Sequence, residues 1–503
     1  MQHQKQIDEL KRRLQDIAHF NSALGLLVWD QEVNLPRKAV DSRAETISYL
    51  SGVIHNKFIQ IDSDDLLSEL KRELDTGKIK GKDAVIVFET WRSYEREKKL
   101  PEDFVKELAR VTSKAQSIWA EARKKNDFEL FLPWLTNVVD LKRKEALYIG
   151  YTDSPYDALL DQFEPGMTAQ ETSRILNDLK DFLIPFVKKI TDTKQEMDQK
   201  KFLGNFPIER QKAFNEFVAK QIGYDTEAGR LDISTHPFST SFHPYDARIT
   251  TRYKEDDVLY SLGSTIHETG HALYEQGFSA EHFGTPLAES ISLGIHESQS
   301  RLWENQIGKS KSFWKHFYPK LQEEFPIPFK DILPDDFYRI YNEVKPSLIR
   351  TESDEVTYNL HIILRYEIEK EMIEGAIDLK ELPSVWESKM KDYFGLTVPN
   401  DSVGVLQDVH WSNGGIGYFP TYSFGNLYAA QLFASMKKQI PGLDESIANG
   451  QFTEIREWLR ENVHVHGKTY TAAGLIKKIS GEELTSFYFI DYLEKKYSEI
   501  YGL

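Results

Sequence analysis

The sequence predicts a mainly α-helical fold with a short β element beside one helix of special interest. Apolar residues recur every three or four positions over most of the chain, which is the period of a helix with one buried face. One segment, Arg230–Tyr253, lacks this period and has the composition of strands and turns. Soon after it, a run with helical spacing contains His267-Glu268-Thr269-Gly270-His271.

Amphipathic helices are expected from the N-terminus onward. Ile7, Leu10 and Leu14 form the first apolar stripe on a charged segment, and Ile17 continues it. Proline and glycine fall mainly between the stripes, and neither a Ser/Gly-rich linker nor an internal repeat separates them. We therefore expect one large domain over residues 1–503, with a deep cleft if the domain is lobed. Further stripes cover Leu66–Leu74, Phe104–Lys124, Thr172–Asp198 and Ile362–Ile373.

The composition argues against several classes of protein. The 503 residues include no cysteine, which fits a reducing cytosol and restricts any metal site to His, Asp and Glu. The formal charge of −16 argues against nucleic acid as the main partner. Met1–Asp16 is charged throughout, and no apolar run approaches the length of a membrane span. We expect a cytoplasmic protein that binds neither membranes nor nucleic acids.

The β element, Arg230–Tyr253, is rich in Thr, Ser, Ile and Phe and contains Pro237 and Pro244. This composition predicts short strands joined by turns. Two roles are open for strands so close to the pentapeptide. They can offer an exposed edge with which an extended peptide pairs its backbone, or form a hairpin that serves only packing.

The helix that carries the pentapeptide has recognisable ends. Asp256 or Asp257 can cap its start, and Gly277 marks its end. Gly270 costs about 1 kcal/mol relative to alanine in a helix, so we expect a compensating close approach by another backbone, a substrate or a tightly packed helix. The buried stripe of this helix is expected to consist of Val258, Leu262 and Ile266.

The pentapeptide has the spacing of a metal site. His267 and His271 are four residues apart, so on a helix their imidazoles share one face and can bind one ion. Glu268 follows the first histidine, where a carboxylate can act as general base toward a water activated by the metal. The same group can later protonate a leaving amine. The structural alternative is that both histidines only pack a core.

A third ligand is expected from the next helical run, Ala288–Gln306, which offers Glu289, His296 and Glu297. A helix with this pentapeptide followed by a helix that bears glutamate is the arrangement of glutamate-ligand zincins. Glu289 and Glu297 are eight residues apart and roughly share a face, so spacing alone leaves both open. Zinc, cobalt and manganese all accept two imidazoles and one carboxylate.

Six short motifs occur in order: His236-Pro237-Phe238, Asp246-Ala247-Arg248-Ile249-Thr250, His267 to His271, His296-Glu297-Ser298-Gln299-Ser300, Ile349-Arg350-Thr351-Glu352-Ser353-Asp354, and Gly404 to Trp411. Trp29-Asp30, Pro36 and Arg43 precede them. This series resembles the thermostable-type metallocarboxypeptidases first known from Thermus aquaticus. Six motifs in order are far more specific than one. The one visible departure is Ser353, where the family pattern has alanine.

The resemblance implies a mainly helical, cytoplasmic and usually homodimeric enzyme that removes residues one at a time from peptide C-termini. It also implies zinc as the cofactor, with cobalt as a possible substitute. His267, His271 and Glu297 are the implied ligands, and the resemblance thereby favours Glu297 over Glu289. The implied partners are peptides with a free C-terminus.

A carboxypeptidase must recognise a free α-carboxylate, and a guanidinium can bind one through two hydrogen bonds. Arg350, Arg248 and Arg301 lie in or beside the matching motifs. We hypothesise that Arg350 holds the substrate carboxylate. The alternative is a structural ion pair, for instance with Asp354 four residues later.

Further substrate contacts are expected from the segment Asn413–Tyr428, which is rich in glycine and aromatic residues and reads as a loop. We hypothesise that Tyr418 or Tyr422, with His410 alongside, stabilises the oxyanion that forms during peptide hydrolysis. The alternative is aromatic packing. His236 either orients the substrate or only caps the turn at Pro237.

The sequence therefore favours a metal-dependent carboxypeptidase of broad specificity. The nearest alternative is an oligoendopeptidase with the same ligands, which would cut a peptide internally rather than trim its C-terminus. A different alternative is a catalytically silent peptide-binding protein. That alternative predicts a damaged pentapeptide, whereas Glu268 and both histidines are intact.

Overall fold

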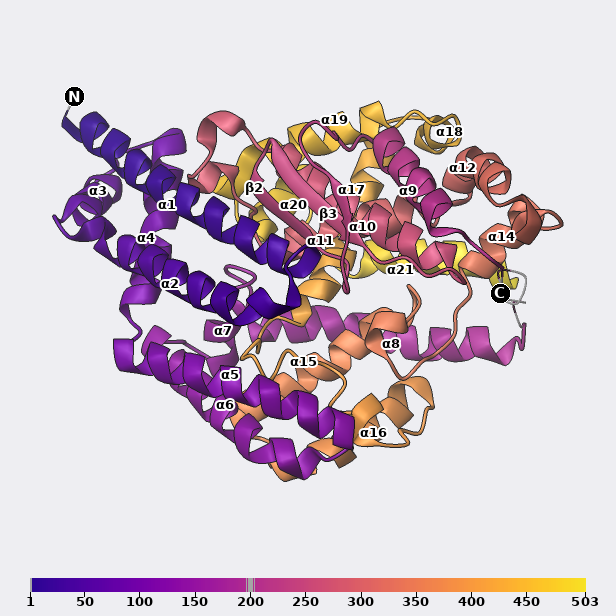
Figure 1. The fold of residues 1–503 in the computed structure, drawn as a ribbon, viewed down its shortest axis with the longest axis horizontal. Coiled ribbons are helices and arrows are strands. Elements are labelled where there is room, and N and C mark those ends of the chain that lie inside the picture. Colours follow the sequence, from indigo (N-terminus) through magenta and orange to yellow (C-terminus); the bar gives the residue numbers. More distant parts are fainter. Residues whose placement is uncertain (1, 196, 198–201, 203) are drawn as a thin grey trace.

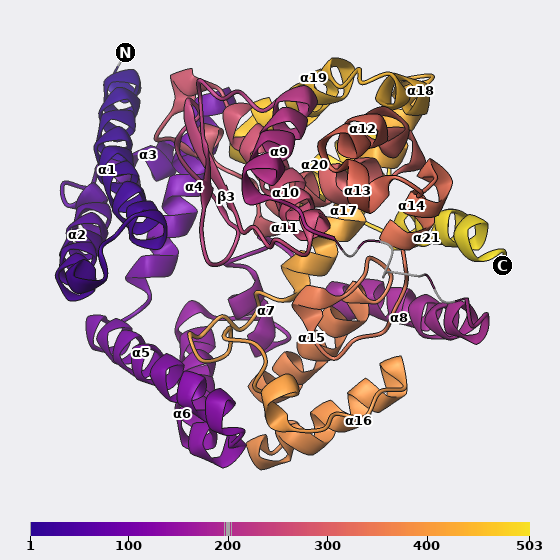
Figure 2. The same ribbon diagram turned by 45° about the vertical axis from the view of Figure 1, so that its right-hand side comes forward.

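The computed structural model describes residues 2–195, 197, 202 and 204–503 and is mainly helical, as the sequence predicts (Figure 1). Its first four helices lie together on one side of the molecule in both views (Figures 1 and 2). They share an apolar cluster that includes Ile7 and Leu10 of the first predicted stripe. Arg43 pairs with Asp30 at 2.8 Å and joins the second helix to the first. The four helices are α1 (Gln2–Val33), α2 (Val40–Ile59), α3 (Leu66–Asp75) and α4 (Gly81–Lys98).

The next helices belong to a second and much larger apolar core. The predicted stripe Thr172–Asp198 is helical only as far as Asp192, so its expected end is wrong. Residues 193–195 and 197 are not helical, and 196 and 198 lie outside the described residues. The prediction of a single domain stays a prediction. These helices are α5 (Glu102–Lys125), α6 (Phe128–Ile149), α7 (Pro155–Leu160), α8 (Ala169–Asp192) and α9 (Ile208–Ile222).

The expected β element is a three-stranded sheet in the order β1-β3-β2. Strand β3 (Asp246–Thr251) is central, parallel to β1 (Leu231–Ile233) and antiparallel to β2 (Ser239–His243). A bulge between Ser241 and His243 interrupts β2, and the Ser22 hydroxyl of α1 donates to the Phe242 carbonyl oxygen at 2.7 Å. The edge strand β2 therefore lies against α1, as Figure 1 shows.

Helix α10 (Val258–Gln276) carries the pentapeptide and begins and ends where the sequence predicts. The Asp257 carboxylate caps it by accepting from the Tyr260 amide at 3.0 Å. The three residues of the predicted apolar stripe are buried. A Cβ on Gly270 would lie 2.6 Å from the Gln299 carbonyl oxygen, so the close approach of another backbone explains this glycine.

Helix α11 begins later than predicted. Pro286 starts a separate 3₁₀ turn, Pro286–Ala288, and Glu289 that follows is extended. The Ser292 hydroxyl then caps α11 (Leu293–Arg301) by accepting from the Ile295 amide at 3.1 Å. Beyond Arg301 the chain continues as a π-helical segment, η6 (Leu302–Ile307).

Of the last helices, α17 (Pro420–Gln439) contacts both α11 and η6. Helix α17 packs directly on α11, because a Cβ on Gly425 would lie 2.3 Å from Cγ of Glu297. The predicted loop Asn413–Tyr428 is wrong beyond Phe419, since Pro420 starts α17 and places Tyr422 on that helix. Within the described residues, no helix has both the length and the apolar character needed to cross a bilayer. These helices are α12 (Lys311–Glu324), α13 (Pro326–Phe329), α14 (Pro334–Tyr341), α15 (Tyr358–Glu374), α16 (Leu382–Phe394), α17 (Pro420–Gln439), α18 (Leu443–Ala448), α19 (Thr453–Asn462), α20 (Ala472–Ser480) and α21 (Phe487–Tyr501).

Candidate active site and metal centre

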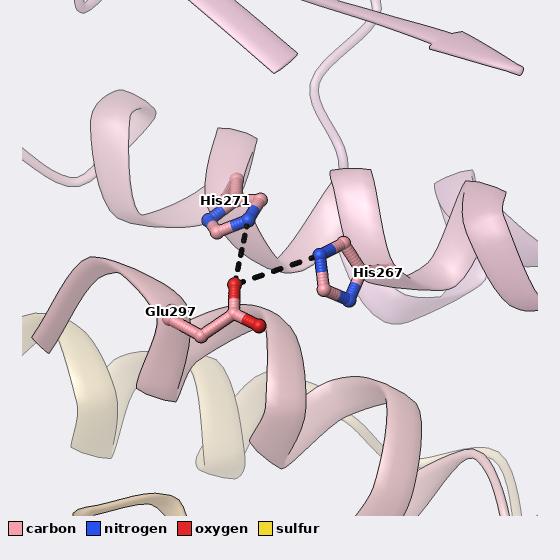
Figure 3. Close-up of side chains that lie close together, drawn as sticks. All are labelled: His267, His271 and Glu297. Atoms are coloured by element: carbon pink, nitrogen blue, oxygen red, sulfur yellow. Dashed lines mark ion pairs between the residues drawn. The ribbon is translucent and has the colours of Figure 1, made fainter. Parts of the chain in front are cut away.

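Three side chains that could hold a metal ion converge between α10 and α11. One ligand atom each from His267, His271 and Glu297 lies within 4.8 Å of the others. Oε2 of Glu297 lies 3.7 Å from Nε2 of His267 and 3.4 Å from Nε2 of His271, as Figure 3 shows. Consecutive turns of α10 supply the two rings, and α11 supplies the carboxylate from the facing side.

The far nitrogen of each ring is held by a partner outside this trio. Nδ1 of His267 lies 2.8 Å from Oε2 of Glu304, and Nδ1 of His271 lies 3.1 Å from the His296 carbonyl oxygen. An acceptor on Nδ1 places the proton there and leaves Nε2 with a free lone pair. Burial lowers the pKa of His271 to about 3, which also favours the neutral imidazole.

Arg301 orients the carboxylate. Its Nε donates to Oε1 of Glu297 at 2.6 Å, and its Nη1 donates to Oε2 of Glu304 at 3.2 Å. Oε1 of Glu297 is thereby engaged, while Oε2 faces both imidazoles. Burial opposes ionisation of Glu297, but Arg301 and the two histidines outweigh it and hold the pKa well below its usual range.

The sequence analysis missed Glu304. This residue lies in the π-helical segment η6, seven positions beyond Glu297. Seven positions are two turns of a helix, so a shared face with Glu297 was a signal available in the sequence. Its carboxylate makes the contact to a ligand histidine that typically fixes the ring and its tautomer in metal sites.

These residues fit a divalent metal ion. Two imidazole nitrogens and one carboxylate oxygen converge, and the second polar atom of each side chain is already engaged, which is the donor set of glutamate-ligand zincins. Against its burial, Glu297 and Glu304 raise the pKa of His267, and a bound ion would displace its proton. The other two candidates for the third ligand have different contacts. Glu289 is about half exposed and pairs with Lys468 at 2.5 Å. Nε2 of His296 lies 2.9 Å from Glu275, and its ring stacks on His271.

Glu268 follows His267, one of the three candidate metal ligands, and its side chain is buried. Burial raises the pKa of its carboxyl to about 7, and the nearby carboxylates of Glu297 and Glu304 act in the same direction. His267 opposes them only while it is protonated. A carboxyl in such surroundings exchanges its proton more readily near neutral pH than an exposed glutamate does.

Arg350 lies in a buried cluster of opposite charges. Its Nε and Nη2 donate to Oδ1 of Asp408 at 3.0 and 2.9 Å, while its Nη1 faces the Tyr358 hydroxyl at 3.2 Å. Arg365 donates to the other oxygen of Asp408 at 2.6 Å. The single carboxylate of Asp408 thus pairs with two guanidinium groups, so the cluster of these three side chains carries one net positive charge. Asp354, the partner considered from the sequence, instead accepts from Lys345, Val356 and Thr357.

An aromatic cluster joins the arginine cluster to the metal ligands. The Arg301 guanidinium lies 4.6 Å from the centre of the Tyr358 ring, and that of Arg350 lies 5.2 Å from the centre of Tyr422. The Tyr418 and Tyr422 rings are 5.3 Å apart. Burial contributes most to the raised pKa of both tyrosines, and the charge of Glu297 acts in the same direction.

His410 completes the aromatic cluster. Its Nε2 lies 3.5 Å from the Tyr422 hydroxyl, and its ring centre is 5.5 Å from that of Tyr418. Burial lowers the pKa of His410 to about 4, so the ring is neutral near pH 7. Four side chains that the sequence analysis assigned to substrate binding, Arg350, His410, Tyr418 and Tyr422, are therefore neighbours.

The two remaining predicted residues lie in or beside the sheet. Arg248 on β3 donates to both carboxylate oxygens of Asp246, at 2.7 and 3.0 Å, and its guanidinium lies 4.4 Å from the centre of the Trp29 ring. His236 is exposed in the loop between β1 and β2, where its carbonyl oxygen accepts from Ser234. Their roles in substrate binding stay predictions.

Known proteins resemble this chain along its length. The family profile described as Carboxypeptidase Taq (M32) metallopeptidase matches residues 9–497. Carboxypeptidase 1 of Bacillus subtilis is 43% identical over 501 residues, which cover 100% of this chain and 99% of that protein. Thermostable carboxypeptidase 1 of Thermus thermophilus is 39% identical, with 97% of each chain covered.

Solved structures agree with these sequence matches. The M32 carboxypeptidase from Deinococcus radiodurans superposes with a TM-score of 0.95 at 37% identity, over 99% of this chain and 100% of that chain. The resemblance inferred from the six motifs is confirmed. The chain belongs to the Carboxypeptidase Taq (M32) metallopeptidase family and is a metallocarboxypeptidase.

Proposed function

We propose that the chain is a zinc-dependent carboxypeptidase of broad specificity, with His267, His271 and Glu297 as metal ligands and Glu268 as general base. Cobalt is a possible substitute for zinc. The observation that carries this proposal is the convergence of two Nε2 atoms and one carboxylate oxygen within 4.8 Å. The engaged outer atoms of these side chains support it, because they turn the converging atoms toward one another. Oε2 of Glu297 also accepts from the Ser300 hydroxyl at 3.1 Å and keeps a second lone pair for the ion.

Glu268 carries the proton in this proposal. A zinc ion, when bound, acts as a Lewis acid that polarises the scissile carbonyl and lowers the pKa of a water molecule. The Glu268 carboxylate accepts the proton of the attacking water and later donates it to the nitrogen of the leaving amino acid. Its burial suits both tasks, because few competing waters reach the carboxylate.

Arg350 gives the site its preference for a chain end in this proposal. The cluster of Arg350, Arg365 and Asp408 carries one net positive charge in a buried position, which a substrate carboxylate would neutralise. Nη1 of Arg350 points to the Tyr358 hydroxyl rather than to Asp408. That hydrogen bond uses one N–H of Nη1, so the second N–H of this nitrogen is available for a substrate.

An Arg350→Ala enzyme is expected to lose roughly 10- to 100-fold in kcat/KM on a peptide with a free C-terminus, because one or two charge-assisted hydrogen bonds disappear. Activity on the C-terminally amidated peptide should change little, so the ratio of the two rates falls. Asp408 keeps Arg365 as its partner, which protects the fold. Arg350→Lys keeps the charge but loses the planar fork, so its preference for the free acid should lie between those of the wild-type and Arg350→Ala enzymes. An unchanged preference for the free acid in Arg350→Ala would rule out this role.

One of the two tyrosines is expected to stabilise the oxyanion. Phenylalanine at that position should lower kcat by about 100-fold or more and leave KM nearly unchanged, because the hydrogen bond forms only in the transition state. Phenylalanine at the other position should change kcat only slightly. Steady-state kinetics of Tyr418→Phe and Tyr422→Phe decide between them. If both variants keep wild-type turnover, the cluster serves packing alone.

We further propose that the substrate lies in a deep cleft along α10. A pocket of about 340 Å³ between α1, β2 and the end of α10 supports only the outer part of this course, since Glu275 lines it one turn beyond His271 but His267, His271 and Glu297 do not. The Ser22 hydroxyl of α1 already binds the Phe242 carbonyl oxygen of the edge strand β2, so a peptide backbone would pair with the rest of that edge. Arg248 and His236 would then contact the substrate. Unchanged KM values for long peptides in Arg248→Ala and His236→Ala would contradict this.

The remaining proposals concern the protein's setting. A homodimer is supported by exposed apolar side chains on α1 and α2, with Leu26 41% and Tyr49 73% exposed. A sedimentation experiment that finds only monomers at micromolar concentration would contradict it. A cytoplasmic location is supported by the absence of cysteine from the sequence. The chain is proposed to act on peptides and not on nucleic acids or membranes, given its charge of −16.

A further inference from the structure

A fully buried glutamate, Glu369 on α15, accepts hydrogen bonds from two ends of one loop. Its Oε1 accepts from the Trp411 indole nitrogen at 2.9 Å, and its Oε2 accepts from the Gly417 amide at 3.1 Å. The Tyr156 hydroxyl donates to Oε2 as well, at 2.7 Å. All three hydrogen-bond partners of this carboxylate are neutral. They come from α7 and from the segment 411–417.

The two loop residues that Glu369 holds are adjacent in sequence to two residues with proposed substrate roles, His410 and Tyr418. Trp411 follows His410, and Gly417 precedes Tyr418. The opposite side of the loop is also fixed, since a Cβ on Gly417 would lie 2.9 Å from the Leu159 carbonyl, and its φ of +94° favours glycine. The loop is therefore clamped between α15 and α7.

We propose that Glu369 is a positioning residue, which fixes His410 and Tyr418 relative to each other for catalysis. This inference rests on the substrate roles proposed above for these two residues. Burial raises the pKa of the Glu369 carboxyl to about 7, so the fold bears a desolvation cost here that an apolar side chain would avoid. Two oxygens that accept from two ends of one loop explain why a carboxylate stands at this position.

A matched control lies elsewhere in the same core. Glu164 is also fully buried, and burial raises the pKa of its carboxyl to about 7 as well. It also accepts from three neutral donors, namely Ser292, Gly294 and Tyr428, each at 3.0 Å. These donors lie at the start of α11 and on α17, and none belongs to the segment 410–418. Replacement of Glu164 therefore disturbs a similar buried site without removing a hydrogen bond of that loop. The one link is the preceding residue, Phe163, whose ring centre lies 5.3 Å from that of Tyr418.

The test compares Glu369→Gln with Glu164→Gln in the zinc-loaded enzyme. A glutamine at position 369 replaces one acceptor oxygen with a donor, so the Trp411 or Gly417 N–H loses its partner. Hydrogen–deuterium exchange of the segment 410–418 should become about 10-fold faster or more in Glu369→Gln and stay unchanged in Glu164→Gln. Unchanged exchange of this segment in Glu369→Gln overturns the proposal.

Kinetics test whether the loop's position matters for the reaction. Glu369→Gln should lower kcat roughly 10- to 100-fold with KM little changed, since the affected groups act in the transition state. In a Tyr418→Phe background the same substitution should lower kcat by less than about 3-fold, because coupled residues are not additive. Equal losses in both backgrounds, or the same coupling for Glu164→Gln, contradict the positioning role.

Two further outcomes remain distinguishable. If Tyr418→Phe alone keeps wild-type kcat, the proposed role of Tyr418 fails. The role of Glu369 is then still decided by two measurements on Glu369→Gln, the hydrogen–deuterium exchange of the segment 410–418 and kcat. If Glu369→Gln does not fold, Trp411→Phe removes the indole donor but keeps a packed ring. That variant should show a smaller change in the same direction, in exchange and in kcat. Wild-type values in both measurements would overturn the proposal.

Discussion

Replacement of Glu268 by glutamine is expected to lower kcat by roughly 10²- to 10⁴-fold, the usual contribution of a general acid–base group. Glutamine has nearly the same size and cannot accept a proton, so the buried site should keep its shape. Glu268 is not among the three groups that converge as ligands, and the metal content should therefore equal that of wild type. Metal analysis and steady-state kinetics on the same preparation measure both quantities.

The metal content serves as the internal control for Glu268→Gln. Lost metal together with lost turnover would show that Glu268 supports the ligands rather than the proton transfer. A kcat within about 10-fold of wild type at full metal content would place the general base elsewhere, since acid–base groups contribute at least about 100-fold.

Loss of the metal site through Glu297 is the second large expected effect. Glu297→Gln should weaken zinc binding by more than about 100-fold, because even a residue that only orients a ligand contributes roughly 10- to 100-fold to affinity. Glu304→Gln should lie within that smaller range, since it removes the negative charge that faces Nδ1 of His267 and Nη1 of Arg301 but removes no proposed metal ligand. Competition with a coloured chelator measures the affinity of each purified variant.

Glu289→Gln is the matched control for this series. Both glutamates were candidates from spacing alone, but Glu289 is about half exposed and pairs with Lys468. Its replacement should leave zinc affinity unchanged. A similar loss of zinc from Glu289→Gln and Glu297→Gln would contradict the assignment of the third ligand.

Local patterns in the sequence predicted the part of the site that one helix builds. An aspartate cap, an apolar stripe and a terminal glycine define α10, and the spacing of its two histidines determines which face they share. All of these signals lie within twenty residues of one another. The sequence also predicted that Gly270 allows a close approach, but it did not show that the approaching group is the backbone of α11.

The parts that depend on turns and distant contacts could not be derived in this way. The start of α11 is set by Ser292 after a 3₁₀ turn, so the expected helix from Ala288 was too long. The partner of Arg350 is Asp408, fifty-eight positions away, and not the neighbour four residues later. Tyr422 lies on a helix because Pro420 starts one, although the glycine-rich segment before it reads as a loop.

The order of the six motifs favoured one candidate for the third ligand, which the spacing of residues alone did not. Spacing left Glu289 and Glu297 equally open, and the resemblance of six motifs favoured Glu297, which is the glutamate that lies against both histidines. The same resemblance directed attention to Arg350 and His410, which lie 60 positions apart in sequence and in one cluster in the fold. Glu304 and Glu369 lie outside those motifs and were found only from the structure.

The most direct test of the central claim is mass spectrometry of the products from one unblocked peptide and its C-terminally amidated twin, with zinc measured in the same enzyme. We expect one zinc ion per chain, a ladder of peptides shortened one residue at a time from the free C-terminus, and little cleavage of the amide. A strong chelator should abolish the ladder. Internal cuts, equal cleavage of both peptides, or activity that survives the chelator would contradict a metal-dependent enzyme that reads the chain end.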